Sequence, residues 1–211
     1  MRVRERSSLT LRGWSILIVI LLALAALILF NLNFFLAPEE PVRTDVLVVE
    51  GWLPDFAYAQ VVNEFHSHPY RTIITTGGPL EKGFYLEQYK TEAGLSAATL
   101  LAVGIGKDSV LAVPSPFTLK DRTFGSAISL RKWIDSTHAP VHSFNILTLG
   151  AHGRRTRLLF EKAFGGGVKI GIISARDLTY DQNRWWASSE GVRKVVDESV
   201  AYLYARFLFF R

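Results

Sequence analysis

The sequence predicts an α/β fold: a three-layer sandwich with a mostly parallel sheet of about five strands, preceded by one transmembrane helix. Beyond residue 44, short apolar segments rich in β-branched residues alternate with helix-length segments. These short segments lack strict polar–apolar alternation, which is typical of strands buried on both faces of a parallel sheet. The alternation of strands and helices predicts βαβ units with right-handed crossovers.

The transmembrane helix is predicted by an almost uninterrupted apolar segment from Trp14 to Leu36. At about 1.5 Å of helix per residue, this segment can cross a hydrocarbon core of about 30 Å. The alternative is a cleaved signal peptide, whose apolar core has only about 7–15 residues and ends at small residues. This segment is longer and ends in two phenylalanines and a leucine, which favours an uncleaved anchor.

The basic residues before the apolar segment predict its orientation. Four arginines precede it, against one acid, Glu5, and they contribute +3 of the net charge of +5. Because positive flanks stay in the cytoplasm, we expect a single-pass protein of the inner (cytoplasmic) membrane with its folded part on the extracytoplasmic side. The predicted division is a basic cytoplasmic N-terminus (1–13), the anchor (14–36), a proline-bearing linker (37–44) and the α/β domain (45–211).

The composition excludes several classes of function. With the N-terminal flank set aside, a net charge of +2 remains, too small for the basic face that nucleic-acid binding needs. The absence of cysteine removes disulfides, thiolate metal sites and cysteine nucleophiles. The histidines show no spacing of metal ligands, so we expect no metal site. No G-x-G-x-x-G follows the first strand and no G-x-S-x-G occurs, so dinucleotide binding and a hydrolase elbow are not supported, and the cofactor stays unassigned.

The elements of the α/β domain follow from apolar patterning and from turn residues. Asp55 is the expected N-cap of the first helix. The predicted strands are 45–49, 71–75, 109–113, 145–149 and 168–173, and the predicted helices are one that begins near 55 and others at about 91–103, 123–134, 154–164 and 191–209.

The last predicted helix is apolar at several positions. We expect these residues to pack against the sheet, and contact with a membrane is the less favoured alternative. The apolar C-terminal tail 206–211 is a further candidate for contact with the bilayer. The apolar positions of the helix are Val195, Val196, Val200, Leu203 and Phe207.

The candidate site lies where the predicted strands end, because ligands of open α/β sheets bind beyond the carboxyl ends of the strands. Glycines there let backbone N–H groups approach a ligand, and helix N-termini favour anions. A histidine beside arginines suits a phosphate or a carboxylate, since arginine can clamp the anion while histidine moves a proton. The strand ends offer Glu50 and Gly51, then Gly77 and Gly78, then His152 and Arg155.

His152 is the predicted catalytic residue, and Glu50 is a candidate second proton-transfer group, as is Glu92. Each position also has a plainer interpretation. The glycine pair can be an ordinary turn, His152 can be a solvated loop residue, and Glu92 can simply offset the macrodipole of its helix. Arg154 and Arg157 are expected to form an exposed helix face.

Five short motifs occur in a fixed order over nearly the whole α/β domain, and together they resemble the YdcF/SanA/ElyC family of bacterial proteins. There are four departures: Glu50, where the family usually has a small residue, Arg122 and Ser126, where it usually has asparagines, and Ala151, where a larger residue is common. The motifs are Val48-Val49-Glu50-Gly51, Thr76-Gly77-Gly78, Thr91-Glu92-Ala93, Arg122-Thr123-Phe124-Gly125-Ser126-Ala127 and Ala151-His152-Gly153-Arg154-Arg155-Thr156.

The resemblance implies a Rossmann-like domain, often carried on an N-terminal membrane anchor. It also implies that the motif positions Glu92, Thr123 and Ser126 contact a ligand. Members of the family are associated with envelope integrity and with peptidoglycan or carrier-lipid metabolism, and binding of S-adenosylmethionine has been proposed among them.

Three hypotheses about function follow. The first is an envelope protein that binds or processes a phosphorylated small molecule, in one version linked to a carrier lipid. The second is a non-catalytic envelope scaffold or sensor. The third is a protein that binds a nucleotide or S-adenosylmethionine. Whether the protein is an enzyme stays open, because no complete catalytic constellation is visible in the sequence.

Overall fold

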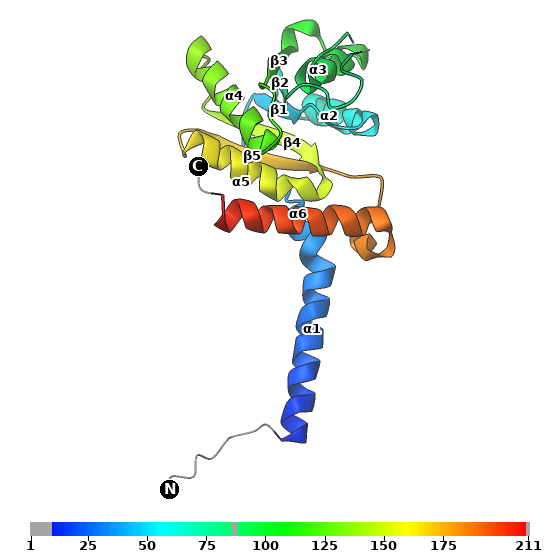
Figure 1. Cartoon of the computed structure of the whole chain (residues 1–211). Coiled ribbons are helices and arrows are strands. Elements are labelled where there is room, and N and C mark those ends of the chain that lie inside the picture. The colour runs from blue at the N-terminus through cyan, green and yellow to red at the C-terminus, as the bar shows by residue number, and fades with distance from the viewer. Residues whose placement is uncertain (1–9, 86–87, 210–211) are drawn as a thin grey trace. The chain divides into compact units, whose positions relative to one another are not determined.

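The computed structural model describes residues 10–85 and 88–209, and the chain divides into two compact units between Leu32 and Asn33. Figure 1 shows the elements in chain order. Helix α1 (Leu11–Leu36) is long and apolar enough to cross a membrane, and it is the one such helix among these residues. Its last turn belongs to the second unit, where Asn33 and Leu36 are buried. The boundary of the folded unit therefore lies a turn earlier than the predicted end of the anchor.

The second unit contains a five-stranded sheet in which every strand is parallel to its neighbours. The strand order β3-β2-β1-β4-β5 matches the first five strands of the Rossmann order, and the all-parallel sheet confirms the predicted fold class. The strands are β1 (Val46–Glu50), β2 (Thr72–Gly77), β3 (Val110–Pro114), β4 (Ser143–Leu149) and β5 (Lys169–Ala175).

Helices cover both faces of the sheet (Figure 1). Along β1, Val48 points into the core under α4 and α5, whereas Leu47 and Val49 point into the core under α2 and α3. This two-sided burial explains why the strands read as continuous apolar segments. The helices are α2 (Asp55–Ser67), α3 (Glu92–Ala102), α4 (Arg122–Thr137), α5 (Gly153–Phe164) and α6 (Ser189–Phe207), with short 3₁₀ turns η1 (Lys107–Ser109), η2 (Gly150–His152) and η3 (Gln182–Ala187).

Residues 37–44 are bound to the sheet and do not form a free linker. Glu40 exchanges two backbone hydrogen bonds with Ile172 of β5, at 2.9 and 3.1 Å. The side-chain amide of Asn145 accepts from the Val42 N–H at 2.7 Å and donates to the Val42 carbonyl at 2.9 Å. Residues 37–44 thus form a strap along the sheet. Gly171 makes room for this strap, because a Cβ there would lie 2.0 Å from Asn145 Oδ1.

Two local predictions need correction. Asp55 is the first residue of α2, and the N-cap is Pro54, whose side chain cannot accept a hydrogen bond. In α6 only Val195 of the five predicted apolar residues is buried, and the other four are exposed. Helix α6 packs instead through Ala205, which lies with Leu159 of α5 and Phe209 in a small apolar cluster. Of the apolar C-terminal tail, residues 210–211 lie outside the described part of the chain.

Candidate functional site

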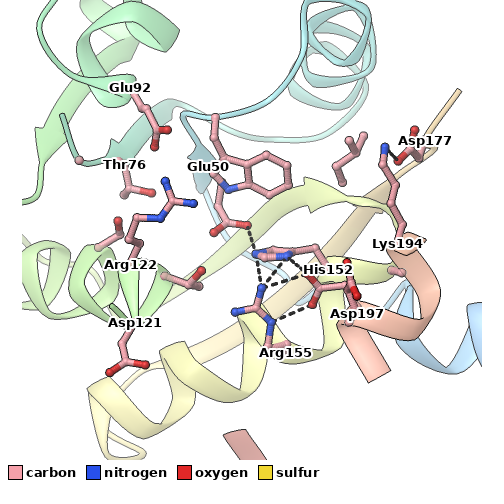
Figure 2. A pocket seen from close by; sticks show the side chains of 18 of the residues that line it. Glu50, Thr76, Glu92, Asp121, Arg122, His152, Arg155, Asp177, Lys194 and Asp197 are labelled. Carbon is pink, nitrogen blue, oxygen red and sulfur yellow. Dashed lines mark hydrogen bonds and ion pairs between the residues drawn. The ribbon is translucent and has the colours of Figure 1, made fainter. Parts of the chain in front are cut away.

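A cavity of about 520 Å³ lies at the carboxyl edge of the sheet, where β1 and β4 are neighbours. The connections from these two strands run to opposite faces of the sheet, which makes this the topological switch point at which open α/β sheets bind ligands. Side chains from β1, β2, the starts of α3, α4 and α5, and the middle of α6 line it (Figure 2).

Glu50 ends β1 and is only 3 % exposed. Its Oε2 accepts hydrogen bonds from the hydroxyls of Thr148, on the neighbouring strand β4, and of Thr156 on α5, the latter at 3.1 Å. A buried carboxylate is tolerated when such donors replace water. The carboxyl group of Glu50 is therefore held in place at the floor of the cavity.

His152 lies opposite Glu50, at the turn from β4 into α5. Gly150 allows this turn with a φ of +50°, a conformation that favours glycine. The His152 Nδ1 lies 2.7 Å from Glu198 Oε1, and its Nε2 lies 3.7 Å from Glu50 Oε2. The ring of Trp52 meets the imidazole edge-on, with centroids 4.9 Å apart. The imidazole is thus held between two carboxylates, and Figure 2 shows the side of it that faces Glu50.

Glu198 of α6 binds both His152 and Arg155. The Arg155 Nε donates to Glu198 Oε2 at 2.8 Å and its Nη2 donates to Oε1 at 3.0 Å, a bidentate pair. Burial raises the pKa of Glu198, but the hydrogen bonds and charges of His152 and Arg155 outweigh this effect and lower the pKa to about 2. For Arg155, burial lowers the pKa, and the hydrogen bonds and charge of Glu198 raise it above its usual value.

The tautomer of His152 follows from these contacts. Glu198 is ionised and can only accept, so Nδ1 carries a proton toward it. The 3.0 Å approach of Arg155 Nη2 to Nδ1 is then a close contact between two donors that share one carboxylate. The Nε2 atom remains to exchange a proton, and it faces Glu50.

The other side of the cavity is formed by β2 and by the starts of α3 and α4. Thr76 is buried, and within the described residues its hydroxyl has no hydrogen-bond partner. Burial raises the pKa of Glu92; the Arg122 charge lowers it, and Glu81 and Glu50 raise it further. Arg122 forms an ion pair with Glu81 at 2.5 Å, in which both side chains are more than half exposed.

All of the predicted site residues except Gly51 line this cavity. Gly51 is instead packed against backbone: its N–H donates to the Thr76 carbonyl at 2.6 Å, and a Cβ would lie 2.5 Å from the Glu92 carbonyl oxygen. Arg154 and Arg157 lie outside the cavity and pair with Glu40. The predicted residues that line it are Glu50, Gly77, Gly78, Glu92, Thr123, Ser126, His152 and Arg155.

Sequence reasoning missed the contributions of α6. Glu198 orients His152, and Lys194 binds the buried Asp177 at 2.5 Å on the far side of the cavity. The missed signal is the helical spacing of charge, because Lys194, Asp197 and Glu198 recur at i, i+3 and i+4 and share one face. Within residues 10–85 and 88–209, no group of three or more His, Asp or Glu side chains is placed to hold a metal ion.

The chain matches no protein-family model, and no curated protein is significantly similar to it.

Proposed function

We propose that this chain is a membrane-anchored envelope protein of the YdcF/SanA/ElyC type that binds a phosphorylated ligand and moves a proton with His152. In this proposal helix α1 holds the chain in the inner membrane, and the basic N-terminal flank favours an extracytoplasmic α/β unit. The observation that carries the proposal is His152, held by Glu198 and facing Glu50 at the carboxyl edge of the sheet.

The proton transfer takes place at the Nε2 atom of His152. Glu198 keeps Nδ1 protonated, so Nε2 alternates between acceptor and donor as a general base or acid. Glu50, at 3.7 Å, stabilises the imidazolium form that arises when Nε2 takes up a proton. Both carboxylates are already held by hydrogen bonds, so this charge arrangement needs no rearrangement when a ligand enters.

The phosphate is assigned to Arg122 and the start of α4 rather than to Arg155. Arg155 is committed to Glu198 through two hydrogen bonds and acts as a positioning residue. The exposed pair Arg122–Glu81 contributes only about 0–1 kcal/mol, so a phosphate can displace Glu81. The side chain of the N-cap residue Asp121 does not cap α4, which leaves the first amides of the helix to an anion.

The remainder of the ligand is expected to carry hydrogen-bond donors, because acidic side chains outnumber basic ones around the cavity. Carboxylates accept from hydroxyl and amide groups and repel a second anion. A phosphorylated, hydroxyl-bearing headgroup, free or on a carrier lipid, fits this distribution. The acidic lining residues are Glu50, Glu92, Asp121, Asp177, Asp197 and Glu198, and the basic ones are Arg122, Arg155 and Lys194.

The test uses the full chain in lipid nanodiscs and follows thermal unfolding with a polyprenyl phosphate, the matching polyprenol, inorganic phosphate, ATP and S-adenosylmethionine. We expect the phosphates to raise Tm and the alcohol not to. Replacing Arg122 by alanine should weaken binding about ten- to a hundredfold, the loss of one charge-assisted contact. The control Lys132→Ala, also on α4, should bind as the wild type does.

His152→Gln separates binding from function. The variant should bind the phosphate within a few-fold of the wild type, because the phosphate contacts lie at α4, but it should fail to complement a deletion strain. Equal binding by Arg122→Ala and Lys132→Ala would refute the anion site. Stabilisation by S-adenosylmethionine alone would favour the nucleotide-type alternative, and full complementation by His152→Gln would favour a scaffold.

A further inference from the structure

Helix α6 exposes an apolar stripe on its outer face. The stripe recurs at every turn of the helix, where a surface helix of a globular protein ordinarily carries polar residues. Val200, Leu203 and Phe207 are 63 %, 53 % and 62 % exposed. A continuous exposed apolar surface of this kind marks an interaction site. The stripe consists of Val192, Val196, Val200, Leu203 and Phe207.

The opposite face of the same helix builds the candidate site. Glu198 is two residues from both Val196 and Val200, and at about 100° per residue it points away from them. Lys194 shares the side of Glu198 and binds Asp177, while Ala205 packs against α5. Helix α6 therefore has one face in the cavity wall and one face without a partner among the described residues.

The end of the membrane-crossing helix identifies the occupant of the stripe. The last turn of α1 belongs to the same compact unit as α6. In that turn, the ring of Phe35 meets the ring of Tyr202 on α6 edge-on, with centroids 5.5 Å apart. Phe35 is the next-to-last residue of the apolar span, so this contact puts α6 beside the end of the span, where the chain would leave the bilayer.

The residues beside the stripe also suit a membrane surface. Arg193 and Arg206 are exposed and lie on its two edges, about 60–80° from its centre on a helical wheel. Arginine on the flank of an apolar helix face reaches up to lipid phosphates, and tyrosine, such as the exposed Tyr204, favours the interface.

We propose that the outer face of α6 lies in the membrane interface as a second, non-spanning contact with the bilayer. The stripe enters the boundary between headgroups and acyl chains by about 5–10 Å, parallel to the membrane plane. The cavity then lies about one helix diameter, roughly 10 Å, from the lipid headgroups. This inference rests on the anchoring by α1 proposed above, and it deepens the proposed function by making a lipid-borne headgroup the favoured ligand.

The test exploits the absence of cysteine from the natural chain. Each variant of the full chain carries one cysteine labelled with a nitroxide. Two labels lie in the stripe, at Val200→Cys and Leu203→Cys. Two reference labels lie at Leu21→Cys in α1 and at Lys132→Cys on α4, where the lysine is exposed. They are reconstituted in vesicles of phosphatidylcholine and phosphatidylglycerol. Electron paramagnetic resonance then compares collisions with oxygen, which enters the bilayer, and with a water-soluble nickel complex.

We expect labels at 200 and 203 to be accessible to oxygen and protected from nickel, at a shallow depth of about 5–10 Å. The label at 21 should lie deeper, and the label at 132 should behave as in water. Nickel accessibility at 200 and 203 equal to that at 132, with 21 immersed, would overturn the contact and leave the anchor intact. An aqueous label at 21 would overturn both. Protection of 200 from both reagents together with spin–spin broadening would mean that a second copy covers the stripe, and would also overturn the proposal.

Discussion

Glu198 controls the electrostatics of the site because it is the shared partner of two cationic groups. It binds the Nδ1 of His152 and two nitrogens of Arg155, and these contacts lower its pKa from 4.5 to about 2. A carboxylate whose pKa is depressed by folding stabilises the folded state above its unfolded pKa. That stabilisation is lost as the pH falls through the folded pKa.

The pH dependence of stability should therefore change when Glu198 is replaced. Between about pH 4.5 and pH 2 the free energy of unfolding of the wild type should fall by on the order of 3 kcal/mol because of Glu198. Glu198→Gln lacks this contribution, so its free energy of unfolding should depend less on pH. The measurement is urea unfolding of the full chain in detergent micelles, followed by tryptophan fluorescence. The control Glu190→Gln, at the start of α6 and outside the cavity, should keep the wild-type slope. Equal slopes in all three proteins would contradict the prediction.

The buried carboxylate of Glu50 depends on two threonine hydroxyls. Thr156→Val keeps the shape of the side chain and removes one donor, so the free energy of unfolding at pH 7 should fall by about 1–3 kcal/mol. The exposed hydroxyl of Thr137 bonds a backbone carbonyl at the end of α4, and Thr137→Val should change stability by less than about 0.5 kcal/mol. Comparable losses in the two variants would mean that the Glu50 contact carries no particular weight.

At the scale of elements, the end of β1 is pressed against the start of α3. Gly51 is required there by its close approach to backbone rather than by a ligand. Gly51→Ala should lower the free energy of unfolding by about 1–3 kcal/mol, because a Cβ would force backbone apart. Gly106→Ala is the matched control: its φ is −64° and no atom lies within 4 Å of the new Cβ, so stability should be unchanged or slightly higher. Equal effects of the two substitutions would refute the packing role.

Helix α6 shows what an apolar pattern leaves undecided. Its period indicated a helix with one apolar face, and the helix is present, yet that face is exposed and the charged face lies in the cavity wall. Hydrophobic periodicity reports that a face is apolar but not what covers it. Core packing and a membrane surface leave the same pattern in the sequence.

At the scale of the whole molecule, the orientation of the anchor is a prediction from the charge asymmetry of its flanks. In bacterial spheroplasts, a membrane-impermeant maleimide should label Lys132→Cys on the α/β unit before lysis. The variant Thr10→Cys, whose cysteine lies before the span, should be labelled only after lysis. The opposite pattern would reverse the topology, and labelling of both positions before lysis would mean that the membrane does not separate them.

Most of the fold could be predicted, because the five buried strands and the helices between them have different hydrophobic periods. The parallel direction follows from the helices that connect successive strands, whereas the order β3-β2-β1-β4-β5 was not predicted and came from the structure. Element ends were predicted less well, as at Pro54 and at the strap of residues 37–44. Those ends depend on caps and long-range hydrogen bonds, such as that of Asn145 with Val42, that leave no local pattern.

The sequence by itself determined the fold class, the apolar span and the edge of the sheet at which His152, Glu50 and Arg155 meet. These follow from local periodicity and from the shared direction of parallel strands, whose carboxyl ends lie at one edge. Only the tertiary structure decided the role of each side chain. It brought Glu198 from the last helix to His152, joined Arg155 to Glu198 by two hydrogen bonds, and packed Gly51 against backbone. The physical reason is that hydrogen bonds and ion pairs act over a few ångströms, whereas the partners that they join lie far apart along the chain.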